Sequence, residues 1–205
     1  MYCEIRYNFI YDIRSPFGSA THGIYLDDCV SGEHVFGNVL YQASPSSAIM
    51  HGGGRDDIIE NNVIVESGAA LHTDTRGTSA IQHDGSSWDL LKKIEDMNYT
   101  QDPWKSAYPA LAAIPDNWSQ IAGSHWLYPE GCVFSRNIGW KNDLWTVEGS
   151  GQPLSHFAEQ KDNIQDQDPQ FVDEANLDLT LKSSSPAFSI PGFQPIPFSQ
   201  IGIQK

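Results

Sequence analysis

Carboxylate, imidazole and guanidinium side chains recur at regular spacing between residues 22 and 83. Asp27 and Asp28 close the stretch GIYLDD, and His51 closes AIMH, 24 residues after Asp27 (51 − 27 = 24). These are among the side chains that most often donate or accept a proton in catalysis. We therefore take Asp27, Asp28 and His51 as the candidate catalytic residues.

The histidines are followed by a pattern that suits a polar substrate. An arginine lies four residues after His51 and again four residues after His72. If Asp27 and His51 stack in successive coils, the third residue of the column is His72 or His83. AALH places His72 there, but SAIQH copies SAIMH more closely and would place His83 there. The candidate substrate-binding residues of this set are Arg55, His72, Asp74, Arg76 and His83.

Three tryptophans are candidate platforms for sugar rings. The face of a pyranose ring is apolar and packs well on a large aromatic side chain that also carries a polar handle. Trp104 and Trp126 lie in a segment without the repeat, and Trp145 lies after the repeat resumes. All three join the predicted substrate-binding residues, and we expect the partner to be a polysaccharide or oligosaccharide.

The sequence contains no ligand spacing typical of a transition-metal site, such as HExxH. Carboxylate oxygens are instead the ligands that calcium prefers. We expect no cofactor and no protein-bound metal. The alternative is calcium held by Asp27, Asp28, Asp56 and Asp57.

These residues must be positioned by a repeated structure. GIYLDD is answered by AIMHGGG, and HVFGNVLY by DIIENNVIV, with Asn38 and Asn62 again 24 residues apart (62 − 38 = 24). A period in the twenties, made of short apolar runs broken by Gly, Asn and Asp, is typical of a β-solenoid. We predict an all-β, right-handed parallel β-helix with strands over 5–13, 23–27, 35–41, 48–51, 58–66, 69–72, 132–140, 144–148 and 177–181. Stacked asparagines at one turn should include Asn8, Asn38, Asn62 and Asn137.

The chain is predicted to be one domain, 1–205, with two additions to the solenoid. Residues 84–130 break the repeat and form an inserted helical segment, with helices expected over 88–97 and 108–114. Residues 168–205 are expected to cap the last coil. Because the sequence opens directly in a strand, we expect further N-terminal coils, or a partner chain, to cover that end.

The net charge of the chain limits the classes of partner that it can bind. The formal net charge is −14, whereas nucleic acids and anionic membranes attract clusters of Lys and Arg. We therefore expect neither as a partner. Three cysteines do not form a disulfide framework.

The motifs HGIYLDD, AIMHGGGRDDIIENN and the closing LTLKSSSPAF resemble secreted parallel β-helix proteins of the pectate-lyase-like superfamily. The likeness is greatest to the C-terminal part of its glycoside-hydrolase branch, which degrades polysaccharides. The resemblance implies a secreted or periplasmic glycoside hydrolase that uses two acidic residues on the parallel sheet.

By resemblance, Asp27 and Asp28 supply one member of that acidic pair. The next coil carries His51 where the second acid is expected, so Asp56, Asp74 and Asp84 are the candidates for it. Two alternatives stay open. One is a polysaccharide lyase that acts on a uronate-containing glycan, with His51 as base and Arg55, Arg76 or calcium as neutraliser. The other is a non-catalytic carbohydrate-binding or structural β-helix.

Overall fold

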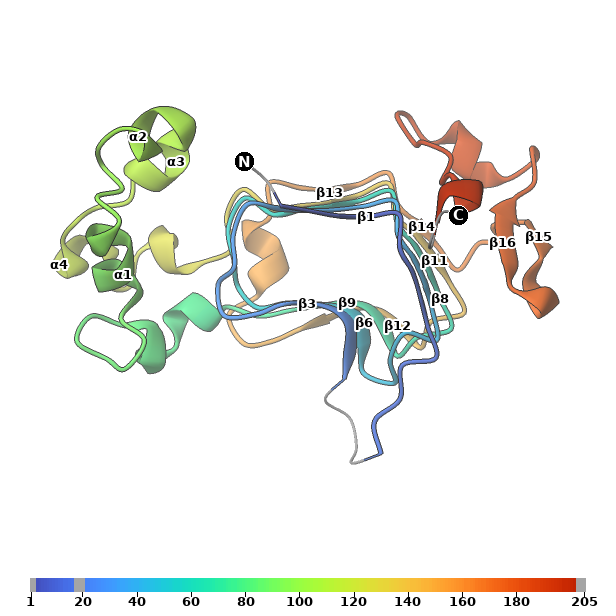
Figure 1. Ribbon diagram of the computed structural model, residues 1–205. Coiled ribbons are helices and arrows are strands. Elements are labelled where there is room, and N and C mark those ends of the chain that lie inside the picture. The colour runs from blue at the N-terminus through green and yellow to red at the C-terminus, as the bar shows by residue number, and fades with distance from the viewer. Residues whose placement is uncertain (1–2, 17–20, 202–205) are drawn as a thin grey trace.

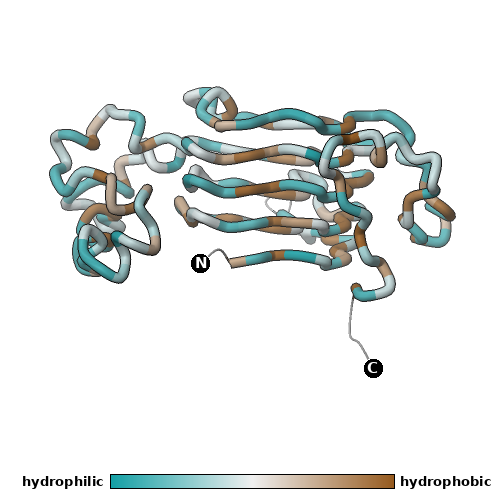
Figure 2. The backbone as a smooth tube through the Cα atoms, turned by 90° about the horizontal axis from the view of Figure 1, so that it is seen from above, coloured by the Kyte–Doolittle hydropathy of each residue, from teal (hydrophilic) through white to brown (hydrophobic). Residues whose placement is uncertain are grey.

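The computed structural model describes residues 3–16 and 21–201, and it shows a parallel β-helix (Figure 1). Successive strands of each coil belong to three different sheets, and every pairing within these sheets is parallel. Seen from the side, the coils lie one above the other as evenly spaced rungs (Figure 2). The predicted β-solenoid is therefore confirmed.

Each of the three parallel sheets takes one strand from a coil, except that sheet C has no strand from the last coil. Sheet A contains β1 (Cys3–Arg6), β4 (Glu33–Phe36), β7 (Ile58–Glu60), β10 (Val133–Ser135) and β13 (Glu159–Lys161). Sheet B contains β2 (Phe9–Tyr11), β5 (Val39–Tyr41), β8 (Val63–Val65), β11 (Ile138–Trp140) and β14 (Ile164–Gln165). Sheet C contains β3 (His22–Leu26), β6 (Ser47–His51), β9 (Ala69–Thr73) and β12 (Leu144–Glu148).

A tight corner separates sheet A from sheet B, so the strands predicted over 5–13, 35–41 and 58–66 are each two strands. The corner residue has positive φ in every coil, at Tyr7, Gly37, Asn61, Arg136 and Asp162. Gly37 has no alternative there, because a Cβ on it would lie 2.7 Å from a ring carbon of Tyr7. The left-handed conformation turns the chain within two residues and thereby ends each strand.

The residue after each corner is an asparagine, and the predicted asparagine stack is confirmed. Asn62 is fully buried; its Oδ1 accepts from the backbone N–H and the side-chain amide of Asn38, each at 3.0 Å. Its own amide donates to the Val35 carbonyl of the coil below at 3.0 Å. Asn163, which the sequence analysis did not include, extends the stack by accepting from the Asn137 backbone N–H. The stack satisfies corner groups that have no strand partner.

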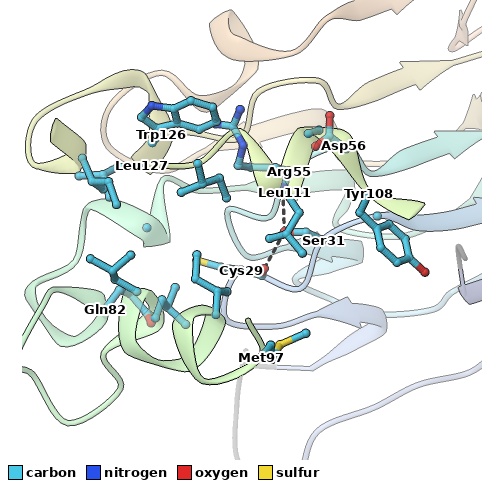
Figure 3. Close-up of a pocket in the computed structure, with 18 of the residues that line it drawn as sticks. Cys29, Ser31, Arg55, Asp56, Gln82, Met97, Tyr108, Leu111, Trp126 and Leu127 are labelled. Carbon is cyan, nitrogen blue, oxygen red and sulfur yellow. Dashed lines mark hydrogen bonds between the residues drawn. The ribbon is translucent and has the colours of Figure 1, made fainter. Parts of the chain in front are cut away.

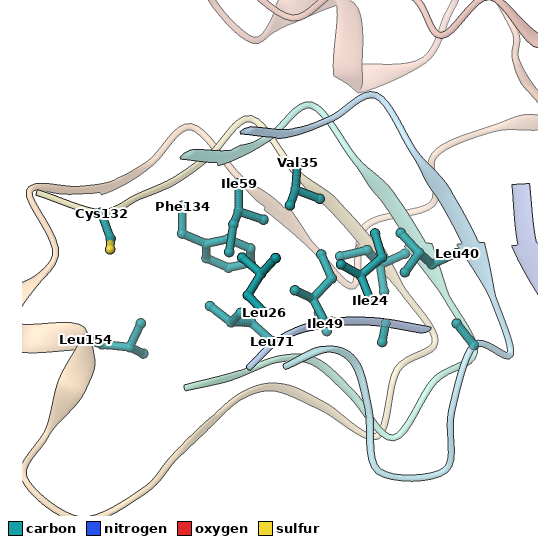
Figure 4. Packing of buried hydrophobic residues seen from close by; sticks show 14 of the residues in the cluster. Ile24, Leu26, Val35, Leu40, Ile49, Ile59, Leu71, Cys132, Phe134 and Leu154 are labelled. Atoms are coloured by element: carbon teal, nitrogen blue, oxygen red, sulfur yellow. The ribbon is translucent and has the colours of Figure 1, made fainter. Parts of the chain in front are cut away.

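The interior of the coils is filled by one hydrophobic cluster (Figure 4). Ile24, Ile49 and Leu71 lie one above the other in sheet C and point inward, toward Val35 and Ile59 of sheet A. Each of these five side chains is at most 6% exposed. Burial of such residues stabilises the coil by about 1.5–3 kcal/mol per side chain.

The inserted segment leaves the solenoid after β9 and returns at β10, so it spans 74–132 instead of the predicted 84–130. Its helices are α1 (Leu90–Asp96), α2 (Trp104–Ala107), α3 (Pro109–Ala112) and α4 (Trp118–Ile121). Short 3-10 turns lie at Arg76–Thr78, Ala80–Gln82 and His125–Leu127. The segment stands beside the corner between sheets C and A (Figure 1). Among the described residues, no helix is both long and apolar enough to cross a bilayer.

The C-terminal segment lies along the outer face of sheet B, which corrects the predicted cap over the last coil. Outward side chains of β5 and β8, Val39, Val63 and Val65, form a second apolar cluster with Leu179 and Ile196 of this segment. It includes an antiparallel pair, β15 (Phe171–Asp173) and β16 (Asp178–Leu181), and 3-10 turns at Glu174–Asn176, Pro186–Ser189 and Phe198–Gln200. A separate 3-10 turn at Pro153–His156 lies earlier in the chain, and its Leu154 belongs to the inner cluster. Sheet B is apolar on both faces and therefore needs this cover. We call residues 168–201 the C-terminal strap (Figures 1 and 2).

Candidate functional site

The register of sheet C places His51 inside the coil and corrects the predicted column of Asp27, His51 and His72. His51 pairs with Leu26 below and with Thr73 above. Successive side chains of a strand point to opposite faces, so an offset of one residue turns His51 inward. Its side chain is fully buried and has no surface for contact with a polysaccharide.

His51 is the centre of a buried hydrogen-bond network. Its Nε2 lies 3.0 Å from Asp57 Oδ2, and its Nδ1 lies 2.9 Å from the Thr73 hydroxyl. The other oxygen of Asp57 accepts from the backbone N–H of Glu33 at 2.7 Å. Every polar atom of the His51 and Asp57 side chains therefore has a partner, and the network joins the turns of neighbouring coils.

The residues that do stack on Asp27 are Gly52, Asp74 and Gly149. Gly52 N–H donates to the Leu26 carbonyl, Asp74 N–H to the His51 carbonyl and Gly149 N–H to the Thr73 carbonyl. The column thus alternates acid and glycine through four coils. A Cβ on Gly52 would lie 3.2 Å from Arg76 Nη1. The missing side chain leaves room for that guanidinium between the two acids.

Arg76 gathers three carboxylates, and we call Asp27, Asp28, Asp74 and Arg76 the acidic cluster. Arg76 Nη1 contacts Asp27 Oδ1 and lies 3.2 Å from Asp28 Oδ1, and Nη2 lies 2.9 Å from Asp74 Oδ2. Burial lowers the pKa of Arg76, but the hydrogen bond to the Tyr25 hydroxyl and the charge of Asp74 outweigh it and raise the pKa. The predicted Asp27, Asp28, Asp74 and Arg76 are thereby brought together.

The outer face of sheet C beside the acidic cluster carries rings. Tyr25, Met50 and His72 occupy one outward row of three successive coils. The His22 ring packs edge-on against Tyr25 with 5.0 Å between centroids. Burial, followed by the charges of His72 and Arg76, lowers the pKa of His22 against the opposing effect of a hydrogen bond to Ser47. His72 therefore lies on this outer face, but in the row of Tyr25 and Met50 instead of the predicted row of Asp27, whereas His83 lies in the inserted segment.

A pocket of about 700 Å³ lies between the inserted segment and the turns that precede β4 and β7 (Figure 3). Side chains of all four helices line it on one side, and the turns at 29–32 and 53–56 line it on the other. We call it the insert pocket. Cys29, Gly53 and Gly77 line it and directly follow Asp28, Gly52 and Arg76 in the chain. The insert pocket therefore adjoins the acidic cluster.

Arg55 lines the insert pocket and holds its wall. Its guanidinium carbon lies 5.0 Å from the ring centroid of Trp126. Nη1 donates to the carbonyls of His125 and Tyr128, each at 3.1 Å, and Nη2 lies 3.3 Å from Glu130. Most of its donors are used by the segment that returns to β10. The role of Arg55 in substrate binding stays a prediction. In this geometry Arg55 would affect a substrate indirectly, by holding the Trp126 ring in place.

The remaining predicted binding residues separate into two places. Trp104 lines the insert pocket. His83 packs against Trp118 of the same pocket, with 4.8 Å between ring centroids and 43° between the ring planes. Trp145 instead packs against Phe134 of the inner cluster at 5.1 Å. Its ring is turned to the core, so a platform role for Trp145 has no support in its packing.

The four aspartates of the calcium alternative are not gathered at one point. Asp27 and Asp28 contact Arg76, whereas both oxygens of Asp57 are bonded to His51 and Glu33. Within the described ranges, the one set of three ligand-type side chains close enough to share an ion is His51, Asp57 and Cys132. Cys132 lies 3.6 Å from His51 Nε2, and burial followed by the charge of Asp57 raises the pKa of its thiol.

Two features of the site had no signal strong enough to find them in the sequence. Gln82 lines the insert pocket, is 3% exposed, and has no hydrogen-bond partner for either side-chain polar atom. Gly52 makes room for Arg76 but is one of three consecutive glycines. A glutamine in a polar insert and one glycine among several are common, so neither stands out before the structure is known.

Comparison of the chain with models of known protein families, with curated proteins and with solved structures found no match in any of the three.

Proposed function

We propose that this chain is part of a polysaccharide-degrading glycoside hydrolase, secreted or periplasmic, of the pectate-lyase-like superfamily. The observation that carries the proposal is the acidic cluster. It places carboxylates from coils two apart around one guanidinium, on the partly exposed edge of sheet C. The fold, the sequence resemblance and the aromatic side chains nearby support the same assignment.

The spacing of the carboxylates suits glycoside hydrolysis. Neighbouring coils lie about 4.8 Å apart, so the backbones of Asp27 and Asp74 are separated by about 10 Å. Both side chains reach toward Arg76, which brings the carboxylates closer than their backbones. Pairs that cleave glycosides are about 5–5.5 Å apart in retaining enzymes and about 6.5–9.5 Å apart in inverting ones.

The proposed roles follow from this arrangement. Asp27 or Asp28 acts as nucleophile or base, and Asp74 is the second carboxylate that the family pattern requires. Arg76 is a positioning residue, because it contacts all three acids and occupies the space above Gly52. Tyr25 and His72 offer rings and polar atoms to a sugar on the adjacent face.

The test is reducing-end release from a panel of plant and bacterial polysaccharides. On a polysaccharide that is cleaved, Asp27→Asn and Asp74→Asn should each lower the rate by about 100-fold or more. Asp166→Asn, at an exposed aspartate far along the chain in the turn after β14, is the matched control and should retain the rate. Cleavage that survives both cluster substitutions would refute the assignment. Binding without cleavage would favour a non-catalytic β-helix.

A polysaccharide lyase is the second candidate, and the position of Arg76 favours it. A uronate carboxylate could displace one aspartate from the guanidinium of Arg76, which is 21% exposed, while the outward imidazole of His72 removes the neighbouring proton. His72 would replace the buried His51 as base. A lyase product carries a carbon–carbon double bond, so ultraviolet absorbance of the product separates the two reactions.

A further inference from the structure

The insert pocket is more apolar than a sugar site requires. Indoles of Trp104, Trp118 and Trp126 share its wall with aliphatic side chains of α1, α3 and α4, among them Leu91 and Leu111. Figure 3 shows Trp126, Leu111 and Leu127 at this wall. Its volume of about 700 Å³ falls within the range of pockets that bind small molecules. A sugar ring alone would leave these aliphatic side chains without a complementary surface.

One polar side chain on the pocket wall has unmet hydrogen-bonding capacity. Gln82 is 3% exposed, and neither its amide nitrogen nor its amide oxygen has a partner. Leaving a buried amide unpaired costs about 1–3 kcal/mol. The backbone around it is held, because Gln82 N–H donates to the Ser79 carbonyl at 2.9 Å. The next residue, His83, also has an unpartnered Nε2, and its ring packs at a tilt against Trp118.

These two features define the chemistry of an occupant. Flat indole rings favour an aromatic ring that stacks with an offset or meets them edge-on. A primary amide offers one acceptor and two donors, which match a carbonyl or hydroxyl group on that ring or its linker. Because the insert pocket adjoins the acidic cluster, a group held there can be attached to a sugar held at Asp27 and Asp74.

We propose that the insert pocket binds an aryl substituent of the substrate, such as an aromatic acid esterified to a sugar, and that Gln82 bonds its carbonyl or hydroxyl group. This deepens the proposed hydrolase function and rests on it for the attached sugar. The binding of the aryl group itself depends only on the pocket. The indoles supply the stacking surface, and Arg55 fixes the Trp126 wall through its bonds to the returning chain.

Binding is tested with a matched pair of small esters. Methyl 3-phenylpropanoate and methyl 3-cyclohexylpropanoate share the ester carbonyl and differ in the ring. Titration followed by tryptophan fluorescence and by calorimetry should show tighter binding of the phenyl ester. Equal affinity for both esters, or no binding of either, would overturn the aryl assignment.

Gln82→Leu tests the hydrogen bond without threatening the fold. The substitution removes an unpaired buried amide, so the unfolding midpoint should stay the same or rise. Affinity for the phenyl ester should fall by about threefold to tenfold, the loss of one neutral hydrogen bond. Gln120→Leu, on the exposed side of α4, is the matched control and should bind as the parent chain does. Unchanged affinity in Gln82→Leu would overturn the role of Gln82.

The same variants separate this inference from the proposed function. Asp74→Asn should bind the phenyl ester with unchanged affinity, since the ester lacks a sugar. On a cleaved polysaccharide that carries aromatic esters, removal of those esters by mild alkali should raise KM by a larger factor in the parent chain than in Gln82→Leu. Ester binding without any hydrolysis would refute the hydrolase and leave the pocket assignment standing. Hydrolysis without ester binding would refute the pocket assignment and leave the hydrolase standing.

Discussion

The carboxylates of Asp27 and Asp74 contact the two terminal nitrogens of the Arg76 guanidinium. The two aspartates come from coils two apart, and Gly52 occupies the same position in the coil between them. Arg76 therefore counters repulsion between like charges in one column of the solenoid. Arg76→Met keeps most of the side-chain stem and removes the charge. Each partly exposed pair contributes about 0.2–1 kcal/mol, so the free energy of unfolding should fall by about 1–2 kcal/mol. Urea denaturation at low salt measures this loss.

The control for this substitution is Arg136→Met. Arg136 is 23% exposed, close to the 21% of Arg76, but its ion pair is with Glu60 on sheet A. Arg136→Met loses one ion pair instead of three, so its free energy of unfolding should decrease by less than that of Arg76→Met. Added salt should narrow the difference between the two variants, because salt screens exposed charges. Equal losses at all salt concentrations would show that the acidic cluster adds nothing beyond an ordinary surface pair.

The repeat made the fold predictable, because Asn38 and Asn62 mark the same corner in successive coils. The hydrogen bond between their side chains requires that coincidence, so spacing in sequence translated directly into stacking. The position of His51 was not predictable by the same reasoning. Alignment of Asp27 with His51 is wrong by one residue, and an error of one residue reverses the face of a side chain. Asp74, one of three candidates for the second acid, was predicted without a reason to prefer it.

The C-terminal strap shows a second limit of sequence patterns. Strands of three residues are too short for alternation to indicate which face is inside. In β8, Val63 and Val65 point outward to the strap and Ile64 points inward, yet all three are aliphatic. Only the strap explains why both faces are apolar. Long-range packing of this kind leaves no local signal.

The His51 network predicts a structural phenotype. His51→Ala leaves the buried carboxylate of Asp57 without its imidazole partner and opens a cavity beside Phe157, whose ring centroid lies 5.4 Å away. The free energy of unfolding should fall by about 3–5 kcal/mol, as when one partner of a buried pair is removed. Urea denaturation followed by circular dichroism checks this. His72→Ala, on the outer row of the same sheet, should change it by about 0.5 kcal/mol at most. A His51→Ala chain with parental stability and no activity would instead support the catalytic role first assigned to His51.

The asparagine stack predicts a graded effect of position. Asn62→Ala leaves the backbone N–H of Asn38 without its acceptor, removes one of the two acceptors of the Asn38 side-chain amide, and removes a donor from the Val35 carbonyl. An unpaired buried group costs about 1–3 kcal/mol and each of the other two lost hydrogen bonds about 0.5–1.5 kcal/mol, so a loss of about 2–6 kcal/mol is expected. Asn163→Ala, at the end of the stack, removes one acceptor from Asn137 in a less buried place and should cost less. Equal losses in the free energy of unfolding would mean that the contribution of a stacked asparagine does not depend on how deeply it is buried.

His22 predicts a pH dependence of stability whose sign follows from its lowered pKa. Burial, with the charges of His72 and Arg76, makes protonation of His22 harder in the folded chain than in the unfolded chain, where the pKa is 6.5. The unfolded state therefore takes up the proton first, and folding stability falls as the pH drops from 6.5 toward the lower folded-state pKa. His22→Gln removes this titration. Urea midpoints measured from about pH 8 to about pH 5 should fall more steeply in the parent chain than in His22→Gln, and the two should differ least in slope above the unfolded pKa. The two chains share every other titratable group, so parallel curves would show that the ring of His22 is not held neutral by the face of sheet C.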